Sequence, residues 1–210
     1  MKSLLFVSIC LIGVCCSCAP SITRGFQKSK TQTVSKEEIS SLIHSDGKLL
    51  KYNMIIDFMK KHFSGMLLIK QIDKHSVRTL FSTHFGLSLF DLEIRRDTLI
   101  VHHCIEPLQR KSLLSLLQKD LNILFGLNLL STNEVTVYIP TSSDNEILYR
   151  LNDSKIFYRK DLVSDHLKQI KAGKGFGKTI FRLIPDTLTA KEKIQINHPR
   201  LRLSIQLETL

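Results

Sequence analysis

The clearest pattern in this sequence is a strict alternation of apolar and polar residues near its C-terminal end. Within residues 200–208, the apolar members Leu201, Leu203, Ile205 and Leu207 alternate with charged or polar residues. Side chains of a β-strand point in turn to the two faces of a sheet, so this period of two predicts a strand with one buried face and one wet face. The chain must therefore build a sheet whose apolar face is covered by other parts of the molecule.

The same alternation recurs through the chain and is interrupted by short turns. Residues 63–105 predict an antiparallel meander, because four strand-like segments follow one another with turns of two or three residues. In all, about ten strands are expected. They cover residues 63–72, 77–85, 89–95, 98–105, 134–139, 147–151, 155–159, 176–184, 192–197 and 200–208.

Helical patterns appear in three places. The first begins with a capping box formed by Ser35 and Glu38, breaks at Asp46 and Gly47, and resumes over residues 49–61. The second and third are expected at residues 107–125, where Pro107 opens a leucine stripe, and at residues 161–171.

Together these elements predict an α+β fold. We expect a strongly curved antiparallel sheet, an unclosed β-barrel of about ten strands, with three helices on its concave side. A hydrophobic content of 43% is sufficient for a substantial core. Three amphipathic helices cover only part of such a sheet, which leaves room for an apolar cavity suited to a lipid tail.

The first residues predict export. Lys2 precedes an uncharged run that ends at Cys18 and is too short to span a bilayer, as in a secretory signal peptide over residues 1–17. The alternative is a buried N-terminal helix of the domain. Cys18 follows the small residue Ser17, which resembles the bacterial lipobox, although Cys15 stands where that motif usually has leucine. The resemblance implies lipidation of Cys18.

Residues beyond Cys18 suggest how the protein is placed. Residues 18–35 are expected to form the lipidated N-terminus and a flexible tether, since they are rich in Ser, Thr and Lys, and residues 36–210 to form a single domain. No acidic residue follows Cys18 closely, and Ala19 is compatible with release from the inner membrane. We therefore expect a lipid-anchored protein of the outer membrane that faces the periplasm.

The domain resembles a known family in the order of its elements. A helix, the segment FSGMLLIKQ (63–71), a meander, the segment FGLSLFDLEI (85–94), a helix opened by Pro107 and a second antiparallel set resemble the LolA/LolB superfamily of periplasmic lipoprotein carriers. The resemblance implies an acyl-binding interior, and the lipid anchor suits a LolB-like member. It implies reception or transfer of lipoproteins or lipids, with a periplasmic carrier protein as a partner. The protruding loop with an exposed leucine that LolB carries is not placed on this sequence.

The apolar faces of the predicted strands supply the candidate lipid contacts. Polar residues between them, such as Asp91, Glu93, Arg202 and Gln206, are expected in solvent. The alternative is a closed core packed by the same apolar side chains. The lipid-cavity candidates are Phe81, Phe90, Leu92, Ile94, Phe181, Leu203 and Ile205.

The formal net charge of +11 indicates an acidic partner, an anionic lipid surface or nucleic acid. The basic residues are scattered and no nucleic-acid recognition motif accompanies them, so nucleic acid is the least favoured for an exported protein. The expected partners are acyl chains and, through the N-terminal lipid, a membrane.

No motif predicts catalysis, a cofactor or a metal. Residues 172–179 fit a loosened P-loop, but a strand-like segment follows where a helix is needed, so a flexible glycine loop entering a strand is the better interpretation. His102, His103 and Cys104 alternate between faces and supply too few ligands for zinc. The protein is therefore expected not to be an enzyme. The alternative functions are an accessory envelope lipoprotein with a filled core that binds protein or glycan and, on residues 172–179 alone, a phosphate-using enzyme.

Overall fold

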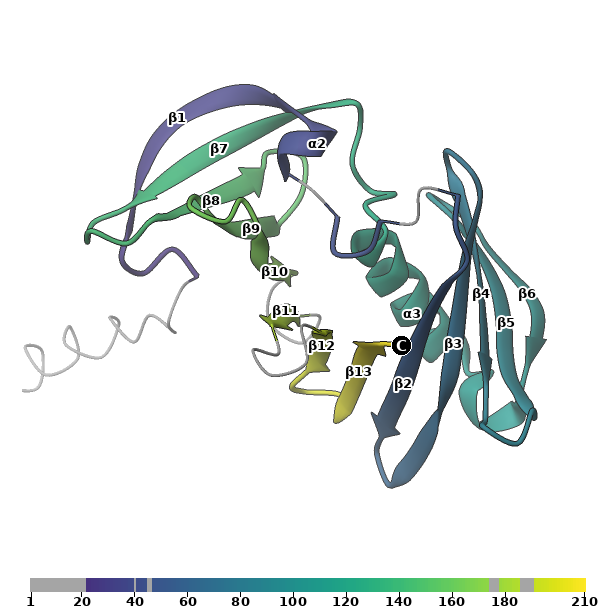
Figure 1. Cartoon of the computed structure of the whole chain (residues 1–210). Coiled ribbons are helices and arrows are strands. Elements are labelled where there is room, and N and C mark those ends of the chain that lie inside the picture. Colours follow the sequence, from purple (N-terminus) through teal and green to yellow (C-terminus); the bar gives the residue numbers. More distant parts are fainter. Residues whose placement is uncertain (1–21, 40, 45–46, 174–177, 186–190) are drawn as a thin grey trace, which may run out of the picture.

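The computed structural model describes residues 22–39, 41–44, 47–173, 178–185 and 191–210. These residues form a 13-stranded sheet whose pairings are all antiparallel, in the order β1-β7-β8-β9-β10-β11-β12-β13-β2-β3-β4-β5-β6. The sheet curves strongly, and its two outermost strands do not pair with each other (Figure 1). The expected unclosed, curved antiparallel sheet is confirmed, although it has more strands and fewer helices than expected.

Along the chain, the strands form three groups: β1, then β2 to β6 after helix α2, then β7 to β13 after helix α3. The last strand, β13, pairs with β2. The strands are β1 (Phe26–Ser35), β2 (Leu50–Phe58), β3 (Lys61–Asp73), β4 (Ser76–Ser82), β5 (Ser88–Arg95), β6 (Leu99–Cys104), β7 (Thr132–Pro140), β8 (Glu146–Leu151), β9 (Ile156–Asp161), β10 (Leu167–Ala172), β11 (Thr179–Pro185), β12 (Glu192–His198) and β13 (Leu203–Thr209). The helices are α2 (Lys36–Ile39), the 3-10 turn η2 (Glu106–Leu108) and α3 (Lys111–Leu124).

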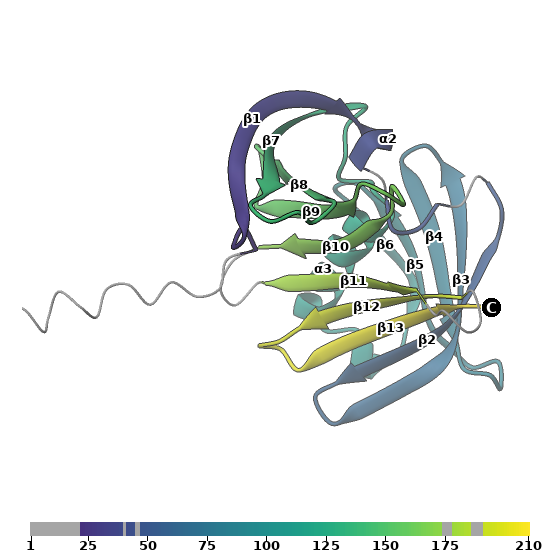
Figure 2. The ribbon, with the colours of Figure 1, turned by 60° about the vertical axis from the view of Figure 1, so that its left-hand side comes forward.

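The meander and the central helix were predicted well. Strands β3 to β6 occupy the expected segments, and α3 lies on the concave side of the sheet between its two arms (Figures 1 and 2). Gly65 lies where β3 and β4 come very close, because a Cβ atom there would be 2.0 Å from the backbone oxygen of Ser82. Only glycine fits this contact without a shift of the backbone.

The helix expected at residues 49–61 is wrong. This segment forms β2, whose residues Tyr52, Met54 and Ile56 are buried at every second position. Leu50, Met54, Ile55 and Phe58 of the same segment fit a helical spacing, so periodicity alone does not separate the two structures. The segment is a strand because its backbone hydrogen-bonds to β3 on one side and to β13 on the other.

The helix expected at residues 161–171 is also wrong. Leu167 and Ile170 are both buried at a spacing of three residues, which is typical of a helix. In the structure they belong to β10, where an irregularity in the pairing with β9 between Leu167 and Gln169 inserts an extra residue. A β-bulge of this kind shifts the alternation by one position and gives a strand a spacing of three.

The N-terminal part of the domain differs from the expectation as well. Phe26–Ser35, expected within the flexible tether, forms the edge strand β1 along β7. Most of β1 is exposed on both faces, so its sequence lacks alternation and resembles a linker. The first helix is only the four residues of α2, which the Ser35 hydroxyl caps by accepting a hydrogen bond from the backbone N–H of Glu38 at 3.3 Å.

Candidate functional site

The predicted lipid contacts all lie in the hydrophobic core of the described domain. They come from β4, β5, β11 and β13, and the cross-strand pair Phe81 and Phe90 brings two rings to 5.3 Å between centroids. None is more than 2% exposed, and all seven belong to one buried cluster. These residues are Phe81, Phe90, Leu92, Ile94, Phe181, Leu203 and Ile205. Their role as ligand contacts stays a prediction.

The polar residues between them lie on the opposite, convex face. Asp91 accepts two hydrogen bonds from the Arg78 guanidinium at 2.9 and 2.7 Å, and these bonds hold the pKa of Asp91 below its usual range. Glu93 accepts two hydrogen bonds from the Arg95 guanidinium, both on the same carboxylate oxygen. Arg202 is exposed. The alternation in the sequence therefore identified the inner and outer faces of these strands.

A buried polar cluster that the sequence analysis missed ties α3 to the sheet. The Nε2 atom of His198 lies 2.5 Å from an Asp120 carboxylate oxygen, and the Nδ1 atom of His198 lies 3.1 Å from the Thr179 hydroxyl. Burial raises the pKa of Asp120, and the hydrogen bond from His198 opposes that rise. Asp120 lies on the leucine stripe of α3 at the same spacing as Leu117 and Leu124, and this position was the signal that could have found it.

The order hydroxyl, imidazole, carboxylate is that of a nucleophile with its base. Here, however, Thr179, His198 and Asp120 are each 4% exposed or less. Side chains this deep in the core meet other protein atoms and not a substrate. The cluster therefore links α3 to the start of β11 and to the end of β12 through buried hydrogen bonds.

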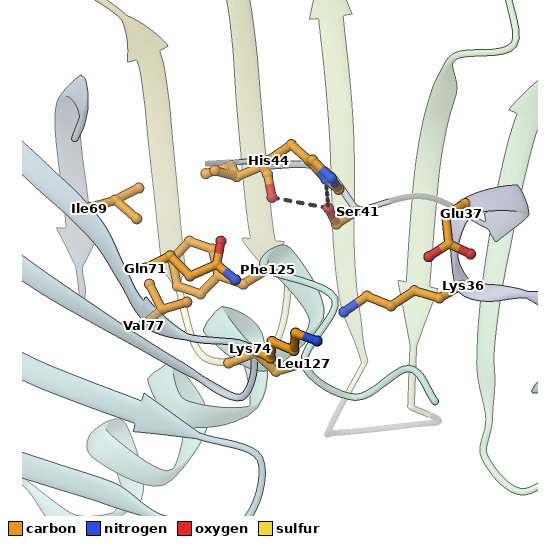
Figure 3. Close-up of a pocket in the computed structure, with 11 residues that line it drawn as sticks. Lys36, Glu37, Ser41, His44, Ile69, Gln71, Lys74, Val77, Phe125 and Leu127 are labelled. Atoms are coloured by element: carbon orange, nitrogen blue, oxygen red, sulfur yellow. Dashed lines mark hydrogen bonds between the residues drawn. The ribbon is translucent and has the colours of Figure 1, made fainter. Parts of the chain in front are cut away.

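A pocket opens at one end of the apolar interior, between the segment after α2, the β3–β4 hairpin and the end of α3 (Figure 3). It has a volume of about 350 Å³. Its floor is apolar and buried, and its rim is polar. The lining residues are Lys36, Glu37, Ser41, Ile43, His44, Ile69, Gln71, Lys74, Val77, Phe125 and Leu127. None of the predicted lipid contacts is among them.

Two lysines give the rim of this pocket positive charge. Figure 3 shows the Lys36 and Lys74 side chains reaching toward the opening from opposite sides. Lys36 is half-buried, and burial lowers its pKa; the neighbouring Glu37 opposes that effect and Arg96 adds to it. Ser41 and His44 hold the segment after α2 in place, since the Ser41 hydroxyl lies 3.0 Å from the Ile43 carbonyl oxygen and 3.1 Å from a His44 ring nitrogen.

The other motifs keep their structural interpretations. His102 lies beside Glu93 at 3.4 Å and His103 beside the Ser88 carbonyl at 3.2 Å, while burial raises the pKa of Cys104. Within the described ranges, no three His, Cys, Asp or Glu residues gather as metal ligands. Thr179–Pro185 is a strand, so the helix that a P-loop requires after its glycines is not formed there. Residues 174–177 of that segment lie outside the described residues.

Cys18 and the expected signal peptide also lie outside the described residues. In the part of the chain that the structure covers, every helix is too short or too polar to span a bilayer.

Comparisons with known proteins add little to this description. No model of a protein family matches the chain, and no curated protein matches it. Among solved structures, it is similar to a crystal structure of a DUF1329 family protein from Desulfovibrio piger. The identity is 9% and the TM-score 0.28, over 82% of this chain and 86% of that chain. The protein is not assigned to a family on this likeness.

Proposed function

We propose that this protein is a LolB-like, lipid-anchored protein of the outer membrane that binds acyl chains and receives or transfers lipoproteins or lipids on the periplasmic face. The observation that carries the proposal is the pocket of Figure 3, whose floor is part of the hydrophobic core. An acyl tail that enters this opening meets the apolar interior directly. The protein needs no covalent chemistry to hold it.

The floor of the pocket supports this proposal energetically. Ile43, Ile69, Val77, Phe125 and Leu127 are all 8% exposed or less and belong to the core cluster. Burial of each methylene group of an acyl chain against such side chains is worth about 0.8 kcal/mol. The pocket volume of about 350 Å³ is at the lower end of the range of small-molecule sites, about 300–1,000 Å³.

The rim supports an amphiphile whose head is anionic. Lys74 is exposed and Lys36 is half-buried at the opening, so both ammonium groups can meet a carboxylate or phosphate that stays near the solvent. A tail in the apolar floor and a head between two lysines together fix the orientation of a bound lipid.

The turn between β4 and β5 supports contact with a membrane. Phe85 is fully exposed and Leu87 is 63% exposed, although both are large apolar side chains. A turn that presents such residues to water is typical of a surface that meets lipid or another protein.

A second function has one observation in its favour. The seven predicted lipid contacts pack closely and are 2% exposed or less. Such close packing favours a domain with a filled core. The protein would then be an accessory envelope lipoprotein that binds protein or glycan on its outer surface. Acyl binding at the pocket separates the two functions.

Reversal of charge at the pocket rim tests the acyl site. We expect Lys74→Glu to weaken binding of a fluorescent fatty acid about tenfold, because an attractive charge beside the carboxylate becomes repulsive. Binding of the corresponding fatty alcohol should not change. The matched control is Lys51→Glu, which reverses an exposed lysine on β2 outside the pocket lining. Equal losses of binding in the two variants would show that the acyl site is not in this pocket. If the unmodified protein binds neither probe, the filled-core function is the one supported.

Lipidation is tested at Cys18. We expect Cys18→Ala to abolish acylation and to release the protein from the membrane fraction, since the anchoring residue is lost. Cell fractionation and mass spectrometry of the N-terminus measure both effects, with Cys16→Ala as the control within the same leader. Normal processing and membrane association of the Cys18 variant would contradict the proposal.

A further inference from the structure

Two adjacent turns at one end of the sheet combine exposed apolar and basic residues. The β2–β3 turn contains Met59, and the β12–β13 turn contains Leu201. The backbone N–H of Met59 donates to the carbonyl oxygen of Arg202 at 3.0 Å, which fixes the turns side by side. Figure 1 shows both at the lower end of their strands.

The side chains of these turns point into solvent. Met59 is 64% exposed and Leu201 is 44% exposed. The basic residues next to them, Lys60, Lys61, Arg200 and Arg202, are exposed as well. We call Met59–Lys61 and Arg200–Arg202 together the basic end face.

Charges of both signs lie beside the basic end face. Lys61 also lines a shallow cavity of about 440 Å³ whose other charged residues are Glu106 and Arg110. The nearby Asp57 is paired with His62 at 2.7 Å. Basic side chains therefore outnumber acidic ones around these turns.

We propose that the basic end face binds the surface of an anionic phospholipid membrane. In each turn a large apolar side chain stands directly beside basic ones, as in Met59-Lys60-Lys61 and Arg200-Leu201-Arg202. A lipid surface satisfies both, since its phosphates accept the charges and its acyl region takes the apolar tips. A soluble polyanion would satisfy only the charges. The net charge of +11 draws the whole molecule to the same kind of surface.

The positions of the residues in the turns support this binding mode. Met59 has a φ of 57° and Arg202 a φ of 49°, in the left-handed region that non-glycine residues rarely adopt. Both residues are exposed, and the hydrogen bond between their backbones places them next to each other. The inference shares with the proposed function only the assumption that the protein works at a membrane, because it involves neither the pocket nor the lipid anchor.

Vesicle binding tests the inference with the full chain. We compare phosphatidylglycerol-containing vesicles with phosphatidylcholine vesicles, so that the contribution of the N-terminal anchor is the same in both. Lys60→Gln combined with Arg202→Asn should lower binding to the anionic vesicles about 25-fold, roughly fivefold for each charge removed. Asparagine is chosen because it tolerates the left-handed conformation. Binding to phosphatidylcholine should change little.

The control removes the same amount of charge elsewhere. Lys28→Gln combined with Lys30→Gln alters two exposed lysines on β1. A similar loss in this control would show a non-specific charge effect and overturn the inference. So would loss of binding to a short DNA duplex with unchanged vesicle binding in the first variant, which would identify nucleic acid as the partner. Fatty-acid binding should be normal in both variants, so a failure of the acyl site is recognised separately.

Discussion

Replacement of Asp120 by alanine is expected to lower the free energy of unfolding by about 3–5 kcal/mol. The Asp120 side chain is 2% exposed, as is that of His198, its partner. Loss of the carboxylate leaves the His198 imidazole without its acceptor, in a place that water does not reach. Urea unfolding followed by circular dichroism measures the change.

Two variants separate loss of the polar cluster from loss of volume. Asp120→Asn keeps the size of the side chain and an oxygen that can accept from His198, and burial already disfavours the charged carboxylate, so its cost should be smaller. Thr179→Val removes only the outer hydrogen bond and should cost about 1 kcal/mol. If alanine at Asp120 costs no more than asparagine, the cluster does not fasten α3 to the sheet.

The fold was predictable where neighbours in the chain are also neighbours in the sheet. Between Lys61 and Cys104 each strand pairs with the next, and the short turns and alternation are visible in the sequence itself. The leucine stripe of α3 is a local signal of the same kind.

The remainder depends on contacts that no local pattern reveals. β2 pairs with β13 from the far end of the chain, and this pairing turns an ambiguous apolar segment into a strand. β10 carries a bulge that imitates helical spacing, and β1 is an exposed edge strand that resembles a linker. Periodicity measures only which residues are buried, so it fails where burial is slight or the register shifts.

The candidate site, like the fold, was predictable only in part. Alternation identified the inward side chains, because facing direction is a local property of a strand. The opening of the interior was not predicted. Its walls come from the segment after α2, from both strands of the β3–β4 hairpin and from the residues after α3, which meet only when the sheet has curved. Lys36 and Lys74 are far apart in the chain and showed no common pattern.

A glutamate at Leu92 is expected to unfold the domain or to cost several kcal/mol of stability. Leu92 is fully buried on β5, the strand next to the edge strand β6, beside the aromatic pair of Phe81 and Phe90. The polar residue opposite it, Thr79, already donates its hydroxyl to the Leu92 carbonyl oxygen, and an uncompensated buried charge is among the most destabilising changes. Leu203→Glu, 2% exposed on β13, should behave alike.

The outcome also bears on how the interior works. Leu80→Glu is the matched control, since Leu80 lies on β4 beside a shallow hollow of the convex face and is partly exposed. It should leave thermal unfolding nearly unchanged. Suppose that Leu92→Glu unfolds cooperatively while the unmodified protein binds a fatty acid. The acyl tail then occupies the pocket beside Lys74, and the seven core residues pack behind the pocket without contacting the ligand. If Leu92→Glu instead stays folded and loses fatty-acid binding, water reaches Leu92. The acyl chain then lies along β5 itself, and the close packing of the core opens when the ligand binds.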